Sequence, residues 1–110
     1  MNRKKRVLLL GATGSIGRQT LDVLKRHPDE FELAGISAGH NEEALHEIAG
    51  EFDGIQAASV LEGNESRWTV PLFTGPDHVQ KLMDAVDYDI LVNAVVGFAG
   101  LAPTLRALET

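Results

Sequence analysis

Three regularly spaced glycines, Gly11, Gly14 and Gly17, form the clearest chemical signal in the sequence. They follow an apolar run at residues 6–10 and precede a stretch with helical periodicity that begins at Ser15. Glycines between a strand and a helix are typical of dinucleotide sites, where they allow a sharp turn, a close approach of the pyrophosphate and tight packing of the helix. The backbone N–H groups that begin the helix then face the phosphates, and the helix dipole favours that negative charge.

The spacing is GxxGxxG rather than GxGxxG, so the position between a strand and a helix carries this prediction more than the letters do. The alternative is a tight strand-to-helix turn that binds nothing. A P-loop is excluded, because that motif needs a Gly-Lys dipeptide and the chain contains none.

The end of the next predicted strand indicates which dinucleotide would bind. NAD-preferring sites place an Asp or Glu about 20 residues after the glycines, where it binds the ribose 2′-hydroxyl. Here residues 36–41 read Ile-Ser-Ala-Gly-His-Asn, and the first acid is Glu42. Ser37, His40 and Asn41 can donate hydrogen bonds to a 2′-phosphate, which favours NADP. The alternative is that Ser37 and Asn41 only shape a turn and cap the following helix.

The elements that must position these loops alternate between strands and helices. Residues 6–10 predict a strand buried on both faces, and Ser15 begins a helix that should end before Pro28. The spacing of this helix predicts a buried face formed by Ile16, Thr20, Val23 and Leu24. The next expected elements are a strand at 31–37, a helix at 42–51 and a weaker strand at 55–60.

The second half of the chain is expected to continue this alternation. Residues 61–68 are loop-like and too few for a helical crossover to the extended segment at 69–73. The remaining predicted elements are a helix from Thr74 to about Val86, a buried strand at 89–94, an apolar loop at 95–100 and a helix that opens at Pro103.

This order predicts an α/β fold, a Rossmann-like, doubly wound and mainly parallel sheet with flanking helices. Because the last predicted helix reaches Thr110 without a cap, we expect the chain to be a truncated fragment of a larger protein.

Composition limits the function classes. The 110 residues suit one domain, and 10 basic against 16 acidic residues give a net charge of −6, which argues against nucleic acid as a partner. Cysteine is absent, which excludes disulfides and a cysteine nucleophile. No apolar run approaches the ~18 residues of a membrane span, and the run after the basic N-terminus is too short for a signal peptide. A cytoplasmic protein without a membrane partner is expected.

Other candidate groups have simpler structural interpretations. Glu42 and His46 are spaced i, i+4 on a predicted helix and could both touch a metal ion, but a solvated helix face is the simpler interpretation. Trp68 and Tyr88 are most simply local packing residues.

Three segments carry a more specific pattern than the glycine spacing alone. They read Gly-Ala-Thr-Gly-Ser-Ile-Gly-x-x-Thr-Leu-Asp-Val at residues 11–23, Ser-Ala-Gly-His-Asn at 37–41, and Asn-Ala-Val-Val-Gly-Phe-Ala-Gly-Leu-Ala-Pro-Thr-Leu at 93–105. In sequence and in order they closely resemble the 1-deoxy-D-xylulose 5-phosphate reductoisomerase family. With the intervening helices, the similarity covers most of the chain.

The resemblance implies an NADPH-dependent enzyme of non-mevalonate isoprenoid synthesis. The family rearranges and reduces its sugar-phosphate substrate, 1-deoxy-D-xylulose 5-phosphate, to 2-C-methyl-D-erythritol 4-phosphate, using Mg²⁺ or Mn²⁺. By motif matching, the groups that hold the pyrophosphate side of NADPH would be Thr13, Gly14, Ser15 and Ile16. Those that hold the adenosine ribose and its 2′-phosphate would be Gly39, His40 and Asn41. Ala94 and Val95 would approach the nicotinamide end.

This chain departs from the family pattern in three places. The family often has a basic residue where His40 stands, and a further helix normally lies where this chain has the shorter segment 59–68. The family's Asn-Lys-Glu-Ser segment, its metal ligands and its substrate-phosphate site would all follow Thr110.

We therefore expect residues 1–110 to form an NADP(H)-binding Rossmann-like domain that holds no catalytic residue and no metal ligand. The full-length protein would be a homodimer, in the bacterial cytoplasm or, if processed from a plant precursor, in the plastid stroma.

Three other hypotheses remain open from the sequence. An extended short-chain dehydrogenase or sugar epimerase shares GxxGxxG but needs Tyr-x-x-x-Lys, whereas Tyr88 is followed four residues later by Val92. A semialdehyde-dehydrogenase-like reductase would need a catalytic cysteine. A non-catalytic nucleotide-sensing module would bind the same ligand and regulate a partner.

Overall fold

The sheet at the centre of the molecule has five strands, all parallel, in the order β4-β3-β2-β1-β5. The structure is a computed structural model and describes residues 4–95. The strands are β1 (Lys5–Leu10), β2 (Phe31–Ser37), β3 (Ala57–Ser59), β4 (Leu72–Phe73) and β5 (Ile90–Asn93). The predicted parallel α/β sheet is therefore confirmed, and the five expected strand positions all hold strands.

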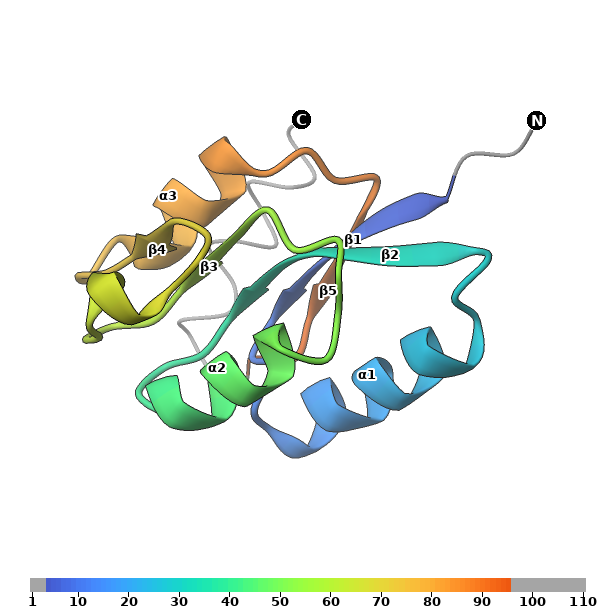
Figure 1. Ribbon diagram of the computed structural model, residues 1–110, viewed down its shortest axis with the longest axis horizontal. Coiled ribbons are helices and arrows are strands. Elements are labelled where there is room, and N and C mark those ends of the chain that lie inside the picture. Colours follow the sequence, from blue (N-terminus) through green and yellow to red (C-terminus); the bar gives the residue numbers. More distant parts are fainter. Residues whose placement is uncertain (1–3, 96–110) are drawn as a thin grey trace.

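Helices cover both faces of the sheet (Figure 1). Helices α1 (Ser15–Arg26) and α2 (Glu42–Ala49) share a core with one face, and α3 (His78–Ala85) packs on the other. The alternation along β1 explains this division: Val7 and Leu9 belong to the first core, whereas Leu8 and Leu10 belong to the second. All four side chains are at most 2% exposed, as the prediction of a strand buried on both faces required.

The buried face of α1 differs from the one that the spacing predicted. Ile16 and Val23 are 55% and 49% exposed, whereas Gly17, Leu21 and Leu24 face the sheet. The reason lies in the glycine loop, because Gly17 must lie against the backbone of that loop, and this contact sets the rotation of the helix. Of the predicted face only Leu24 is buried, so that prediction was wrong about Ile16 and Val23.

The connection from β3 to β4 is a loop with one short 3₁₀ helix, η1 (Glu65–Arg67). The two strands are nevertheless parallel neighbours. The prediction that this segment is too short for a helical crossover is confirmed, and the extended segment at 69–73 contains β4.

Strand β5 is less buried than predicted. Ile90 is 36% exposed, and Leu91 to Asn93 are only half-buried. Within residues 4–95, β5 is an outer strand that pairs only with β1, so one of its edges has no neighbouring strand. Residues 96–100 of the loop predicted at 95–100, and the predicted helix from Pro103, lie outside the described residues. In the described part of the chain, no helix is long and apolar enough to cross a membrane.

Candidate nucleotide-binding site

The carboxyl ends of β1, β2 and β5 meet at one edge of the sheet, where Gly11 begins the glycine loop. Gly11 has a φ of +77°, a left-handed conformation that disfavours other residues, and a Cβ there would lie 3.0 Å from the backbone of Ala94 and Val95. The amides of Gly11 and Ala12 both donate to the carbonyl of Ser37, at 3.1 and 2.8 Å. The loop is thus joined to both neighbouring strands. Ligands of open α/β sheets bind at such an edge, where the connections from neighbouring strands diverge.

The first turn of α1 is open toward this edge. Gly14 is its N-cap, and no side chain caps the helix there. Among the described residues, the atom closest to a Cβ built on Gly14 would be the carbonyl oxygen of Gly11 at 3.6 Å, whereas a Cβ on Gly17 would overlap that same oxygen. The amide of Arg18 is the first to bond within the helix, to Gly14 at 2.9 Å, and Arg18 Nε donates to the Thr13 carbonyl at 3.2 Å. The preceding N–H groups are therefore placed to bind an anion, with a cationic side chain beside them that the sequence motifs did not single out.

The end of β5 borders the glycine loop, as the predicted nicotinamide contacts require. The amide of Ala94 donates to the Leu10 carbonyl at 2.9 Å, and that of Val95 donates to Asn93 Oδ1 at 3.0 Å. Ala94 and Val95 therefore lie beside Gly11 across the junction of β1 and β5. Both side chains are half-buried.

The end of β2 places the three residues matched to the ribose end at the surface. Gly39, His40 and Asn41 are exposed, and a Cβ on Gly39 would meet no atom of the described chain within 4 Å. Asn41 Oδ1 accepts the Ala44 amide at 3.1 Å, so this side chain caps α2, as the alternative interpretation held, while its NH₂ group remains for another acceptor. Ser37 is 1% exposed, so the interpretation of its hydroxyl as a phosphate donor was wrong.

The helix of Glu42 and His46 has a solvated face that includes Glu43 and Glu47, but the Glu42 side chain is only 15% exposed and is bonded to another segment. The Glu42 carboxylate accepts the backbone amide of Asn64 at 2.8 Å and the indole N–H of Trp68 at 3.1 Å. The pKa of Glu42 is lowered chiefly by the Asn64 amide and then by the Trp68 indole, with Arg67 contributing. His46 stands edge-on to the Trp68 ring, 5.0 Å between centroids. Among residues 4–95 there is no group of three His, Asp or Glu side chains placed to hold a metal ion.

A buried polar pair, His78 and Ser59, was missed by the sequence analysis. His78 Nδ1 lies 2.8 Å from Ser59 Oγ, and the two residues are 8% and 0% exposed. The pKa of His78 is lowered, mainly because burial disfavours the charged ring. A histidine next to an N-cap aspartate gives no sequence signal that distinguishes it from a surface residue, so only the packing of α3 on β3 reveals the pair.

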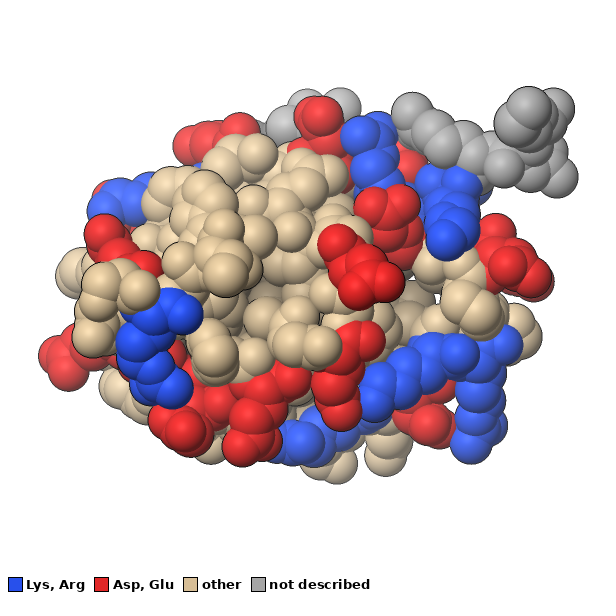
Figure 2. All heavy atoms as spheres, in the orientation of Figure 1, with Lys and Arg blue, Asp and Glu red and all other residues tan. Residues whose placement is uncertain are grey.

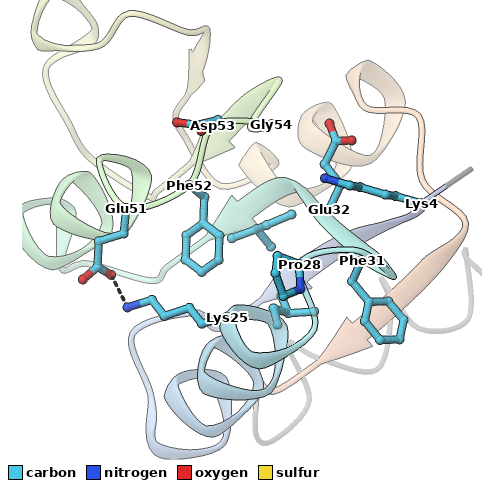
Figure 3. Close-up of a pocket in the computed structure, with 11 residues that line it drawn as sticks. Lys4, Lys25, Pro28, Phe31, Glu32, Glu51, Phe52, Asp53 and Gly54 are labelled. Atoms are coloured by element: carbon cyan, nitrogen blue, oxygen red, sulfur yellow. Dashed lines mark ion pairs between the residues drawn. The ribbon is translucent and has the colours of Figure 1, made fainter.

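A hollow of about 500 Å³ lies at the opposite edge of the sheet, away from the glycine loop. Figure 3 shows it between Phe31, at the start of β2, and Phe52, which follows α2, with Lys25 paired to Glu51 at 3.2 Å on its rim. The wider surface there carries mixed charge, since basic and acidic side chains lie next to one another over α1 and α2 along the lower edge of Figure 2. Nothing in this hollow belongs to the candidate site.

Comparisons with known proteins agree with this geometry. The family model of 1-deoxy-D-xylulose 5-phosphate reductoisomerase matches residues 7–110. Reductoisomerases from Mycolicibacterium smegmatis and Bacillus cereus are 39% and 42% identical to this chain, covering 97% and 96% of it but only 27% and 29% of their own lengths. The chain thus spans under a third of the length of these relatives.

Solved structures of reductoisomerases have the same fold. The enzyme from Zymomonas mobilis in complex with NADPH superposes with a TM-score of 0.84 at 27% identity, over 97% of this chain and 30% of that one. A reductoisomerase in complex with NADPH, fosmidomycin and magnesium gives a TM-score of 0.82 at 26% identity, over 94% and 27%. The motifs, the fold and the family match lead to one conclusion: the chain belongs to the 1-deoxy-D-xylulose 5-phosphate reductoisomerase family.

Proposed function

We propose that residues 1–110 form the NADPH-binding domain of a reductoisomerase that converts 1-deoxy-D-xylulose 5-phosphate to 2-C-methyl-D-erythritol 4-phosphate. The observation that carries the proposal is the open first turn of α1. Gly14 is the N-cap of this helix, and the loop before it lies between the ends of β2 and β5. A relative with this fold is solved with NADPH.

The pyrophosphate would lie at the first turn of α1. The backbone N–H groups of Ser15 and Ile16 would donate to it, with the hydroxyls of Thr13 and Ser15 as further donors. Gly14 supports this assignment, because its missing side chain leaves space that no atom of residues 4–95 fills.

The adenosine ribose and its 2′-phosphate would lie at Gly39, His40 and Asn41. His40 and the NH₂ group of Asn41 are donors on an exposed turn, and Gly39 lets the ribose approach the backbone. The nicotinamide, which supplies the hydride, would lie at Ala94 and Val95, whose half-buried side chains would screen one side of its ring from water.

The remainder of the enzyme is expected to supply the metal and substrate groups. By the resemblance to the family, Mg²⁺ or Mn²⁺ would be held by residues that follow these 110. The proposal includes a homodimeric, cytoplasmic enzyme or, for a plant precursor, one in the plastid stroma.

Calorimetric titration of the chain with NADPH and with NADH tests the proposal. We expect NADPH to bind at least about tenfold more tightly, because each charge-assisted hydrogen bond to the 2′-phosphate contributes roughly 1.5–3 kcal/mol. A His40→Gln variant should lose affinity for NADPH and keep its affinity for NADH. Equal affinities of the unaltered chain for the two nucleotides would contradict the proposal.

A further inference from the structure

Glu42 presents a problem for the proposed 2′-phosphate site. It is the first residue of α2 and directly follows His40 and Asn41. A carboxylate near the end of β2 is what NAD-preferring sites use to bind the free ribose hydroxyl, and it repels a 2′-phosphate. Its pKa is lowered, so Glu42 is ionised at neutral pH. The chain therefore needs some means to keep this charge from the phosphate.

The side chain of Glu42 is turned toward the segment that joins β3 to β4. We call residues 64–68 of this segment the crossover turn. Glu42 Oε2 accepts from the Asn64 amide and the Trp68 indole at 2.8 and 3.1 Å, and Oε1 lies 3.6 Å from Arg67 Nη1. Only 15% of the Glu42 side chain is exposed, against 72% for that of Glu43. Three donors from one turn thus enclose this carboxylate. One of them, the Arg67 guanidinium, carries a positive charge and also donates to Glu43 Oε2 at 3.3 Å.

The crossover turn is itself fixed in place. Asn64 Oδ1 accepts from the Ser66 amide at 3.1 Å and from its hydroxyl at 2.7 Å. His46 Nε2 lies 3.3 Å from the Arg67 carbonyl, and the His46 ring packs edge-on against Trp68. Trp68 also packs against the core that α1 and α2 share with the sheet. The turn can therefore hold a neighbouring side chain in one position.

We propose that the crossover turn holds the Glu42 carboxylate away from the 2′-phosphate of NADPH and offsets its charge. Arg67 and Trp68 are then specificity-determining residues for NADPH over NADH, although they act through Glu42 and need not touch the nucleotide. This inference rests on the proposed function.

A purely structural role for Glu42 makes a different prediction. A carboxylate in the first turn of a helix also stabilises that helix through its dipole. Loss of that effect would destabilise α2 and lower the affinities for NADPH and NADH by the same factor. The ratio of the two affinities therefore separates the hypotheses.

The test is the affinity of the chain for NADPH and for NADH in an Arg67→Gln/Trp68→Phe variant. With the indole N–H and the guanidinium removed, only the Asn64 amide still holds Glu42, and the carboxylate can leave it to turn toward the ribose. We expect NADPH to bind about fivefold more weakly, as for one like charge at short range in water, with NADH unchanged or tighter. The loss should shrink in high salt, because exposed charges are screened. An unchanged ratio would overturn the inference.

Adding Glu42→Gln to this variant is the decisive control. The released side chain then has no charge, so affinity for NADPH should return to within about twofold of the original value. If the affinity does not return, the loss comes from loosening of the turn or from release of Glu43, which also pairs with Arg67, and the inference is wrong. Glu65→Gln is the matched control, since it removes one exposed charge from the same turn without removing a Glu42 contact, and should change neither affinity.

Single substitutions keep the test informative if the double variant does not fold. Glu42→Gln alone preserves an acceptor for Asn64 and Trp68 and should change the NADPH to NADH ratio less than about twofold, because the charge is already offset. A fivefold gain for NADPH would contradict the inference. If the unaltered chain binds neither nucleotide, the proposed function itself fails. If it prefers NADPH and the ratio never changes, only the role of the crossover turn fails.

Discussion

Gly14 and Gly17 lie three residues apart, at the N-cap and in the first turn of α1, yet they lack a side chain for different reasons. Gly17 is buried against the backbone of Gly11 and Ala12, so protein atoms fill the place of its Cβ. Gly14 is exposed and its Cβ would meet only ordinary contacts. The fold therefore does not require glycine at position 14, whereas a bound pyrophosphate would.

Replacing Gly14 by Val should therefore abolish nucleotide binding and leave the fold intact. Gly14 has a φ of −80° and a ψ of 176°, which valine adopts readily, so the side chain would enter the space assigned to the pyrophosphate. We expect affinity for NADPH to fall at least about tenfold, measured by titration, with an unchanged circular dichroism spectrum and urea midpoint.

Two other glycines serve as controls for this substitution. Gly50→Ala should change neither binding nor stability, because Gly50 is exposed with a φ of −72°. Gly17→Ala should destabilise the fold by about 1–3 kcal/mol through overpacking. Unfolding of the Gly14→Val variant would show that the fold itself requires glycine at this position, and would contradict the assignment of this space to the pyrophosphate.

At the scale of the elements, α1 shows what periodicity can and cannot predict. Its bounds were predictable, because Ser15 follows the glycine loop and Pro28 ends the helical pattern. Its rotation was not, because Ile16 and Val23 fit an apolar face as well as Leu21 does. The deciding contact is that of Gly17 with the loop, which has no side chain for a hydrophobic pattern to detect. The rotation of α1 about its axis is thus set by Gly17.

The pairing of α3 with β3 through His78 and Ser59 should make stability depend on pH. Burial lowers the pKa of His78, with a smaller lowering from nearby His40 and Lys81 and an opposing effect of Asp77. As the pH falls below about 6.5, the unfolded chain takes up this proton first, so the free energy of unfolding should decrease. The contribution of His78 to the free energy of unfolding is complete above pH 6.5 and decreases as the pH falls toward the folded-state pKa.

Urea denaturation at about pH 7.5 and pH 5.5 measures this dependence. The lower pH stays above the range in which Glu42 titrates, because the pKa of that carboxyl is lowered. A His78→Gln variant can still bond to Ser59 but cannot take up a proton, so its stability should fall less between the two pH values. An equal fall in both proteins would mean that other groups cause the dependence.

At the scale of the whole molecule, the alternation of strands and helices predicted a parallel sheet but not the order of its strands. Strand β5 follows β4 in the sequence, yet it lies beside β1 at the other side of the sheet. The neighbourhood of β3 and β4 was harder, because β4 has only two residues and η1 only three. In this region the Trp68 indole donates a hydrogen bond to Glu42, which lies 26 residues earlier in the sequence. Neither composition nor spacing indicates such a contact. The candidate site residues were predicted from motifs, whereas the contacts of the neighbouring crossover turn required the structure.

The chain by itself should show no reductoisomerase activity, even with NADPH, Mn²⁺ and 1-deoxy-D-xylulose 5-phosphate supplied. Hydride transfer needs the donor and acceptor carbons held about 3–3.5 Å apart, and the substrate oxygens need a metal ion to polarise them. Among residues 4–95 no group of carboxylates or histidines could hold that ion, and the chain spans only 27% to 30% of its relatives. The measurement is the loss of NADPH absorbance with the purified chain. Substrate-dependent turnover above a blank without protein would show that these 110 residues contain the catalytic groups, and that the division of labour proposed for them is wrong.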